Sequence, residues 1–77
     1  MNEKELQLLN KLAEKVKSKR LELNLSQEAL ADKCGLDRTY ISLLERSKRN
    51  PSYLSLIKLC DGLEINIIEL VGDKCDK

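Results

Sequence analysis

Gly35 is the residue that most restricts how this chain can fold. It follows "SQEALADKC", residues 26–34, in which Ser26 can cap a helix and apolar residues recur at helical spacing. Glycine readily adopts the left-handed conformation in which many helices end, and Asp37 can cap a further helix over residues 38–46. The pattern therefore predicts two short helices joined by a tight turn.

The chain as a whole predicts helices and no sheet. It holds one proline and three glycines, and no segment alternates apolar and polar residues as a strand would. Helices are expected over about residues 3–23, 26–34, 38–46, 51–62 and 66–71, with a frayed tail over about residues 73–77. We therefore expect an all-α fold of five helices, in a single domain over residues 1–77.

Apolar residues at helical spacing predict which helix faces form the core. The small Ala31 suits a close crossing of the two short helices. The expected core residues are Leu9, Leu12, Ala13 and Val16 in the first helix, Leu30, Cys34, Leu36, Ile41 and Leu44 around the turn, and Leu54, Ile57, Leu59 or Cys60, and Leu63 in the fourth helix.

The composition favours a small folded domain without catalytic or metal chemistry. Of the 77 residues, 42% are hydrophobic and 35% are charged, which suits a soluble fold rather than a disordered chain. The three cysteines show no CxxC spacing and there is no histidine, so common zinc sites and histidine acid–base catalysis are not indicated. We expect buried or incidental thiols, no enzymatic activity, no cofactor and no metal.

The sequence also predicts a cytoplasmic protein. No apolar run approaches the roughly 20 residues that cross a bilayer, and the opening "MNEKELQLLN" lacks the basic end and apolar run of a signal peptide. We therefore expect a cytoplasmic location and no membrane partner.

Charge is arranged in blocks, although the net charge is only +1. The net charge is +3 over residues 1–20, −3 over 21–37, +3 over 38–49 and −2 over 50–77. One positive block thus covers the second short helix and the loop after it, which suits contact with a polyanion. A solvated helix face produces such a block as well, so the charge alone does not decide.

The two short helices and their glycine turn have the outline of a helix-turn-helix. The stretch from Gln27 to Arg46, the loop "RSKRNPS" and the helix "LSLIKLCDGLEI" resemble the phage repressor and Cro type of helix-turn-helix domain, the XRE family. The resemblance covers roughly Leu12 to Val71, and "LDRTYISLLERSKRNPS" is also similar to controller proteins of restriction-modification systems. It implies a five-helix unit that binds double-stranded DNA, usually as a homodimer on a two-fold operator.

The helix over residues 38–46 is expected to present a polar face to DNA. At about 100° per residue, the apolar Ile41 and Leu44 fall on the side that packs, with Tyr40 at the border of that side, where its ring packs and its hydroxyl can reach DNA. On the other side, arginine can bond guanine, hydroxyl groups can reach several base edges and leucine can meet a thymine methyl. The candidate base-reading residues are Arg38, Thr39, Tyr40, Ser42 and Leu43. A solvated helix face is the alternative interpretation.

Elements on either side of this helix are expected to hold the DNA backbone. Gln27 opens the first short helix, where its side chain and unpaired backbone N–H groups can meet a phosphate. The basic loop runs into the start of the fourth helix, which offers N–H groups in the same way. The candidate phosphate-binding residues are Gln27, Arg46, Lys48, Arg49, Asn50, Ser52 and Tyr53. A charged surface loop is the alternative.

Two further expectations concern structure rather than DNA contact. The resemblance implies a partly buried ion pair between Arg20 and Glu45. The segment "LEINIIELV" has more large apolar residues than a terminal helix can turn inward, which predicts a homodimer surface. The candidate interface residues are Ile65, Ile67, Ile68 and Leu70.

Together these patterns predict a transcriptional regulator that recognises double-stranded DNA as a homodimer and needs no small-molecule ligand. It would act by repression, activation or both. A DNA-binding antitoxin is an alternative with the same fold. A helical protein-interaction module, whose exposed face meets a protein, is the alternative from another class.

Overall fold

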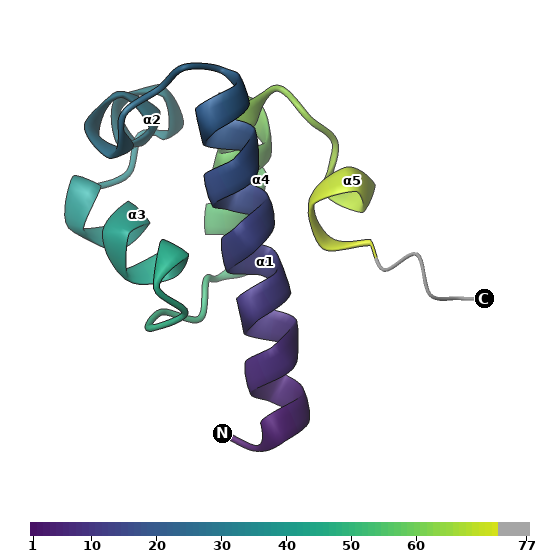
Figure 1. The fold of residues 1–77 in the computed structure, drawn as a ribbon. Helices are drawn as coiled ribbons and strands as arrows, with labels where there is room; N and C mark the ends of the chain where they lie inside the picture. The colour runs from purple at the N-terminus through teal and green to yellow at the C-terminus, as the bar shows by residue number, and fades with distance from the viewer. Residues whose placement is uncertain (73–77) are drawn as a thin grey trace.

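The computed structural model describes residues 1–72, and this part of the chain forms five helices and no strand (Figure 1). In chain order the helices are α1 (Glu3–Glu22), α2 (Gln27–Cys34), α3 (Arg38–Glu45), α4 (Tyr53–Leu63) and α5 (Ile67–Val71). The predicted all-α fold is confirmed, and the helix ends agree to within two residues. The tail predicted for residues 73–77, which includes Cys75, lies outside the described residues.

The long helix α1 contacts α3, α4 and α5, whereas α2 packs mainly on α3 and α4 (Figure 1). Helices α2 and α3 lie on one side of α1, α4 lies behind it, and α5 lies on the other side. The first turns of α1 extend beyond this body, and Leu6 and Leu8 are exposed there. Among the described residues, no helix is both long and apolar enough to cross a membrane.

The turn between α2 and α3 depends on Gly35. Its φ of 72° lies in the left-handed region, and its N–H and that of Leu36 donate to carbonyls in the last turn of α2. Asp37 takes the N-cap position of α3, but the predicted cap is not formed through its side chain, which makes no hydrogen bond there. The backbone of the turn therefore sets the angle between α2 and α3.

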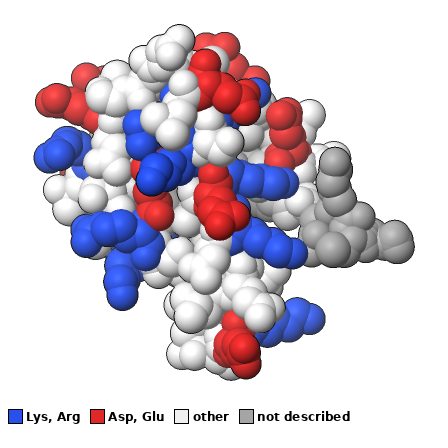
Figure 2. Space-filling model, viewed as in Figure 1, with Lys and Arg blue, Asp and Glu red and all other residues white. Residues whose placement is uncertain are grey.

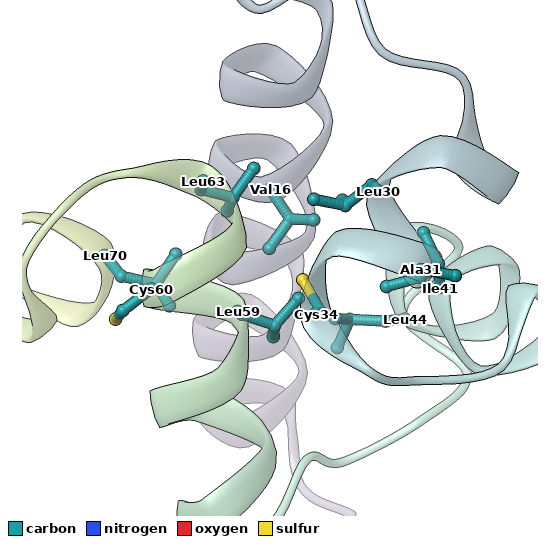
Figure 3. Close-up of a cluster of buried hydrophobic side chains, with 10 residues drawn as sticks. All are labelled: Val16, Leu30, Ala31, Cys34, Ile41, Leu44, Leu59, Cys60, Leu63 and Leu70. Atoms are coloured by element: carbon teal, nitrogen blue, oxygen red, sulfur yellow. The ribbon is translucent and has the colours of Figure 1, made fainter.

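One hydrophobic core joins the five helices (Figure 3). Val16 of α1 lies between Leu30 of α2 and Leu63 of α4 in this view. The buried cluster consists of Val16, Leu30, Ala31, Cys34, Ile41, Leu44, Leu59, Cys60, Leu63 and Leu70. Burial of this apolar surface is the main favourable term that holds α2 and α3 on the domain.

Helix α4 turns a different face inward from the one expected. Ser55, Leu59 and Leu63, each four residues apart, are buried, whereas Leu54 is 70% exposed. The prediction that Leu54 is part of the core is wrong, because Ser55 takes the inward position in the first turn. The buried hydroxyl of Ser55 is satisfied by Ser52 Oγ, which donates to it at 3.1 Å.

Helices α2 and α4 approach closely where Cys34 meets Gly62. A β-carbon added at Gly62 would collide with Cys34 Sγ, so glycine is what permits this approach. Cys34 and Cys60 are buried free thiols, as expected. Burial raises the pKa of the Cys34 thiol to about 11, so this thiol stays neutral near pH 7.

Candidate nucleic-acid interface

Helix α3 has one buried side and one side open to solvent. Ile41 and Leu44 are fully buried, which confirms the packed side of the helical wheel. Of the candidate base-reading residues, Arg38 and Thr39 are exposed, and Tyr40, Ser42 and Leu43 are partly exposed. The open side of α3 therefore offers guanidinium, hydroxyl and methyl groups while the packed side anchors the helix.

A buried carboxylate at the end of α3 joins three helices. Arg20 of α1 donates through Nε and Nη2 to the two oxygens of Glu45 at 2.7 and 3.0 Å, and through Nη1 to the Leu25 carbonyl at 2.8 Å. Gln27 Nε2 of α2 donates to Glu45 Oε1 at 3.1 Å. The expected pair of Arg20 and Glu45 is thus present, and the hydrogen bond raises the pKa of Arg20. The bidentate pair fixes α3 against α1, and the hydrogen bond from Gln27 joins α3 to α2.

Gln27 has a structural contact that the sequence did not reveal. It stands at the first position of α2, as expected of a phosphate ligand, but Glu45 holds one N–H of its side chain. A carboxylate only accepts hydrogen bonds, so this contact sets which end of the amide faces Glu45. Gln27, Ser26, Glu28 and Arg38 line one polar depression, so the starts of α2 and α3 open onto the same surface.

The loop after α3 is anchored to that helix by its backbone. Ser47 adopts the left-handed conformation, with a φ of 60°. Its N–H donates to the Leu44 carbonyl at 3.1 Å, and the N–H of Lys48 donates to the Leu43 carbonyl at 2.8 Å. The start of the basic loop is therefore held against the end of α3.

The candidate phosphate-binding residues flank the open side of α3. Arg46 ends the helix, and its Nε donates to the Ser42 carbonyl at 3.3 Å. Ser52 caps α4 by accepting the Ser55 N–H at 3.1 Å, so its hydroxyl already has a structural role. The exposed candidates are Arg46, Lys48, Arg49, Asn50, Ser52 and Tyr53, whereas Gln27 is partly exposed. Figure 2 shows lysine and arginine side chains on the side of the molecule that carries α3 and this loop, and others across the centre and the opposite side of the same view.

One contact on this surface was not predicted. The guanidinium carbon of Arg49 lies 4.8 Å from the centre of the Tyr40 ring. Helical periodicity relates positions within α3 but does not place a loop residue against them. The only signal in the sequence was an aromatic residue on α3 followed by a basic loop.

A second exposed surface lies at α5, across α1 from α3 (Figure 1). Ile68 is 76% exposed and Val71 is also exposed, while Ile65 and Ile67 are partly buried against the core. The expectation that Leu70 forms part of a dimer interface is wrong, because Leu70 is 1% exposed. The five-residue helix α5 is held on the domain by Leu70, whose side chain is buried in the hydrophobic core.

A groove runs between α1 and α5. Leu8 and Leu12 line it on the side of α1, and Ile68 and Val71 line it on the side of α5. Lys15 Nζ of α1 donates to two backbone carbonyls at the end of α5 at 2.9 and 3.0 Å, where a helix lacks donors of its own. Leu8 and Val71 were not among the four named interface residues, although the first ten residues were expected to be able to add to that surface and Val71 ends the segment "LEINIIELV".

Comparison with known proteins agrees with this architecture. A family model described as helix-turn-helix matches residues 16–70. The chain is 42% identical to the control protein C.MunI of a Mycoplasma species over 73 residues, which covers 95% of each chain. The crystal structure of the restriction-modification controller protein C.AhdI from Aeromonas hydrophila matches with a TM-score of 0.78 and 40% identity, covering 80% of this chain and 94% of that chain.

A further solved structure shows a relative with its ligand. C.Esp1396I bound to a 19 base pair DNA duplex matches with a TM-score of 0.76 and 44% identity, covering 82% of this chain and 84% of that chain. Other structures of C.Esp1396I are of variants at a consecutive arginine, threonine and tyrosine. The same three residue types follow one another here at Arg38, Thr39 and Tyr40.

The chain therefore belongs to the helix-turn-helix family of XRE type, whose members are DNA-binding regulators and not enzymes. Within that family, its relatives include controller proteins of restriction-modification systems.

Proposed function

We propose that this protein is a controller-type transcriptional regulator that binds a specific double-stranded DNA sequence as a homodimer. The observation that carries the proposal is α3, whose exposed start holds Arg38 and Thr39 while Ile41 and Leu44 fix the helix from the opposite side. The DNA-bound structure of C.Esp1396I supports this function, because it has the same fold at 44% identity.

In this proposal α3 enters the major groove of the DNA. The groove is wide enough to admit a helix, and each base pair presents a distinct set of donors and acceptors there. Arg38 suits the O6 and N7 of guanine, and Thr39 suits several base edges. Ser42 and Leu43, which are partly exposed, lie farther along the same face.

Contacts to phosphates position α3 in the groove without reading sequence. The start of α2 at Gln27 approaches the backbone on one side, and the loop at Lys48, Arg49 and Asn50, with Tyr53 at the start of α4, approaches it on the other. The Glu45 contacts tie α1, α2 and α3 together, so they hold the start of α2 in place relative to α3.

We further propose that the surface at α5 joins two copies of the chain. Ile68 is exposed at the edge of the groove, and Leu8 and Leu12 help to line the groove on the side of α1. An exposed apolar side chain and a groove that could accept it therefore occur on the same face. A two-fold axis can place each Ile68 against the partner's groove. The dimer then presents two α3 helices to half-sites about one helical turn apart, and control follows from protein concentration.

A selected-site experiment tests the proposed function. The protein is mixed with a pool of random duplexes, and bound sequences are recovered at several salt concentrations. We expect a two-fold symmetric sequence with half-sites spaced by about 10 base pairs, and affinity that falls steeply as salt rises. Failure to retain any duplex at low salt would rule the proposal out.

A further inference from the structure

Tyr40 and Arg49 form a contact that the proposed function leaves unexplained. Arg49 lies in the loop after α3, and its guanidinium carbon is 4.8 Å from the centre of the Tyr40 ring. Tyr40 is partly buried on α3, whereas Arg49 is exposed. A guanidinium at this distance is attracted to the negative face of the ring, so the contact is favourable in the protein without DNA.

The backbone places Arg49 where it can reach Tyr40. The hydrogen bond from the N–H of Lys48 to the Leu43 carbonyl, at 2.8 Å, fixes the loop one residue before Arg49. Arg49 therefore starts from a defined point beside the end of α3, and the ring determines where its side chain goes. Without the ring, a long exposed arginine would sample many rotamers.

We propose that Tyr40 is a platform that holds Arg49 in position for a DNA phosphate, and that the tyrosine does not read a base. This inference rests on the proposed DNA-binding function and changes the role expected for Tyr40. The contact with the ring uses the charge of the guanidinium, so its N–H groups stay available for a phosphate oxygen. Arg49 is the phosphate ligand, and Tyr40 is a positioning residue.

The advantage of this arrangement is a side chain that is ordered before DNA binds. Ordering a long side chain at an interface weakens binding by roughly 3- to 10-fold, and the ring removes much of that loss in advance. A lysine at the same position would keep the charge, but its compact ammonium lacks the planar fork that stacks on an aromatic ring.

The test compares Tyr40→Phe, which keeps the ring, with Tyr40→Leu, which removes it. Each is made with Arg49 intact and with Arg49→Met, and affinity is measured at a selected operator and at a scrambled duplex over several salt concentrations. We expect Tyr40→Phe to bind both duplexes as the unaltered protein does. Tyr40→Leu should weaken binding to both by roughly 3- to 10-fold, and should have no further effect once Arg49→Met is present.

A measurement without DNA separates positioning from a loss of folding. In the free protein, the ring current of Tyr40 should shift the side-chain proton resonances of Arg49, and the shift should survive Tyr40→Phe but not Tyr40→Leu. If Tyr40→Leu does not fold, Arg49→Lys replaces it, and this variant should lose several-fold affinity at both duplexes although the charge is kept.

Three results would overturn the inference while leaving the proposed function intact. One is a loss of operator preference in Tyr40→Phe, which would make the hydroxyl a base reader. Another is additive effects of Tyr40→Leu and Arg49→Met. The third is the absence of a ring-current shift in the free protein. Failure of the unaltered protein to bind any duplex is distinct, because it removes the proposed function itself.

Discussion

Single side chains around α3 divide into those that hold the site and those that are open to DNA. Glu45 and Arg20 are nearly buried and bonded to one another, whereas Arg38 and Thr39 are exposed. Helical spacing separated the packed and open sides of α3, whereas the pair of Arg20 and Glu45 was expected only from the resemblance to phage repressors. It could not show that Gln27 also bonds to Glu45, because that contact joins residues from different helices.

Arg38→Ala should relax sequence preference more than it weakens binding to unrelated DNA. Loss of a bidentate contact to guanine costs about 1–3 kcal/mol at the operator, and it costs little where no such guanine is read. Competition binding between an operator and a scrambled duplex measures the difference. Lys48→Ala is the matched control, and it should weaken both duplexes equally and reduce the salt slope by about one. Equal losses at both duplexes for Arg38→Ala would make Arg38 a backbone contact.

Cys34 gives the fold a specific sensitivity to alkaline pH. Its pKa is raised from 9.0 to about 11 because burial disfavours the thiolate. The unfolded chain therefore loses this proton first, so the contribution to stability is complete below about pH 9 and is lost as the pH rises towards 11. The loss should be about 2–3 kcal/mol. Urea unfolding from pH 8 to 11 measures this loss. In Cys34→Ala, the free energy of unfolding should fall over the same pH range by about 2–3 kcal/mol less than in the unaltered protein.

Helices pack here through a small number of close contacts. Gly62 of α4 and Cys34 of α2 allow one such approach, and the Glu45 contacts join α3 to α1 and α2. Leu54 shows where pattern analysis of an element fails. Several rotations of α4 bury an apolar stripe, and the burial of Ser55 rather than Leu54 depends on what the neighbouring helices present.

Gly62→Ala should lower the stability of the unaltered protein but raise the stability of the Cys34→Ala variant. In the unaltered protein the new methyl meets Cys34 Sγ, and overpacking of this kind costs roughly 1–3 kcal/mol. With Cys34→Ala also present, the sulfur is gone, and alanine is the better helix former by about 1 kcal/mol. Gly62→Ala should then stabilise the fold. Thermal unfolding of the four proteins in this cycle checks the change of sign, and destabilisation in both backgrounds would contradict it.

Arg20→Met should destabilise the domain by about 3–5 kcal/mol, because Glu45 is left buried without its partner. The double variant Arg20→Met with Glu45→Leu should recover most of that loss, since no buried charge remains. Urea unfolding monitored by circular dichroism gives both values. Equal stability of the single and double variants would show that Glu45 finds water or another donor.

Within the described residues, the two surfaces used in the proposals lie at elements on opposite sides of α1 (Figure 1). One is the open face of α3 with the basic loop, and the other is Ile68 and the groove beside it. This separation lets a dimer form without covering the proposed DNA contacts. The hydrogen bonds from Lys15 to the carbonyls at the end of α5 hold α5 against α1, and so maintain the second surface.

Ile68→Asp should dissociate the dimer while leaving the monomer folded. Ile68 is 76% exposed, so a carboxylate there costs the monomer little, but in the proposed interface it would replace the apolar contact of Ile68 with the leucines that help to line the partner's groove. Sedimentation equilibrium should show a monomer, and affinity for a two-half-site operator should fall by an order of magnitude or more. Leu21→Asp is the control at an exposed leucine that does not line the groove, and it should stay dimeric. If Leu21→Asp is a monomer, or if Ile68→Asp remains a dimer, the interface lies elsewhere on the molecule.

The sequence by itself determined the five helices, the glycine turn at Gly35 and the open and packed sides of α3. These features follow from local backbone preferences and from spacing within one helix, both of which depend only on residues that are close together in the sequence. Only the tertiary structure decided that Leu70 is buried, that Gln27 bonds to Glu45 and that Arg49 lies over Tyr40. Each of these depends on how far one helix is rotated or shifted against another, and that is set by the packing of the whole core rather than by any one segment.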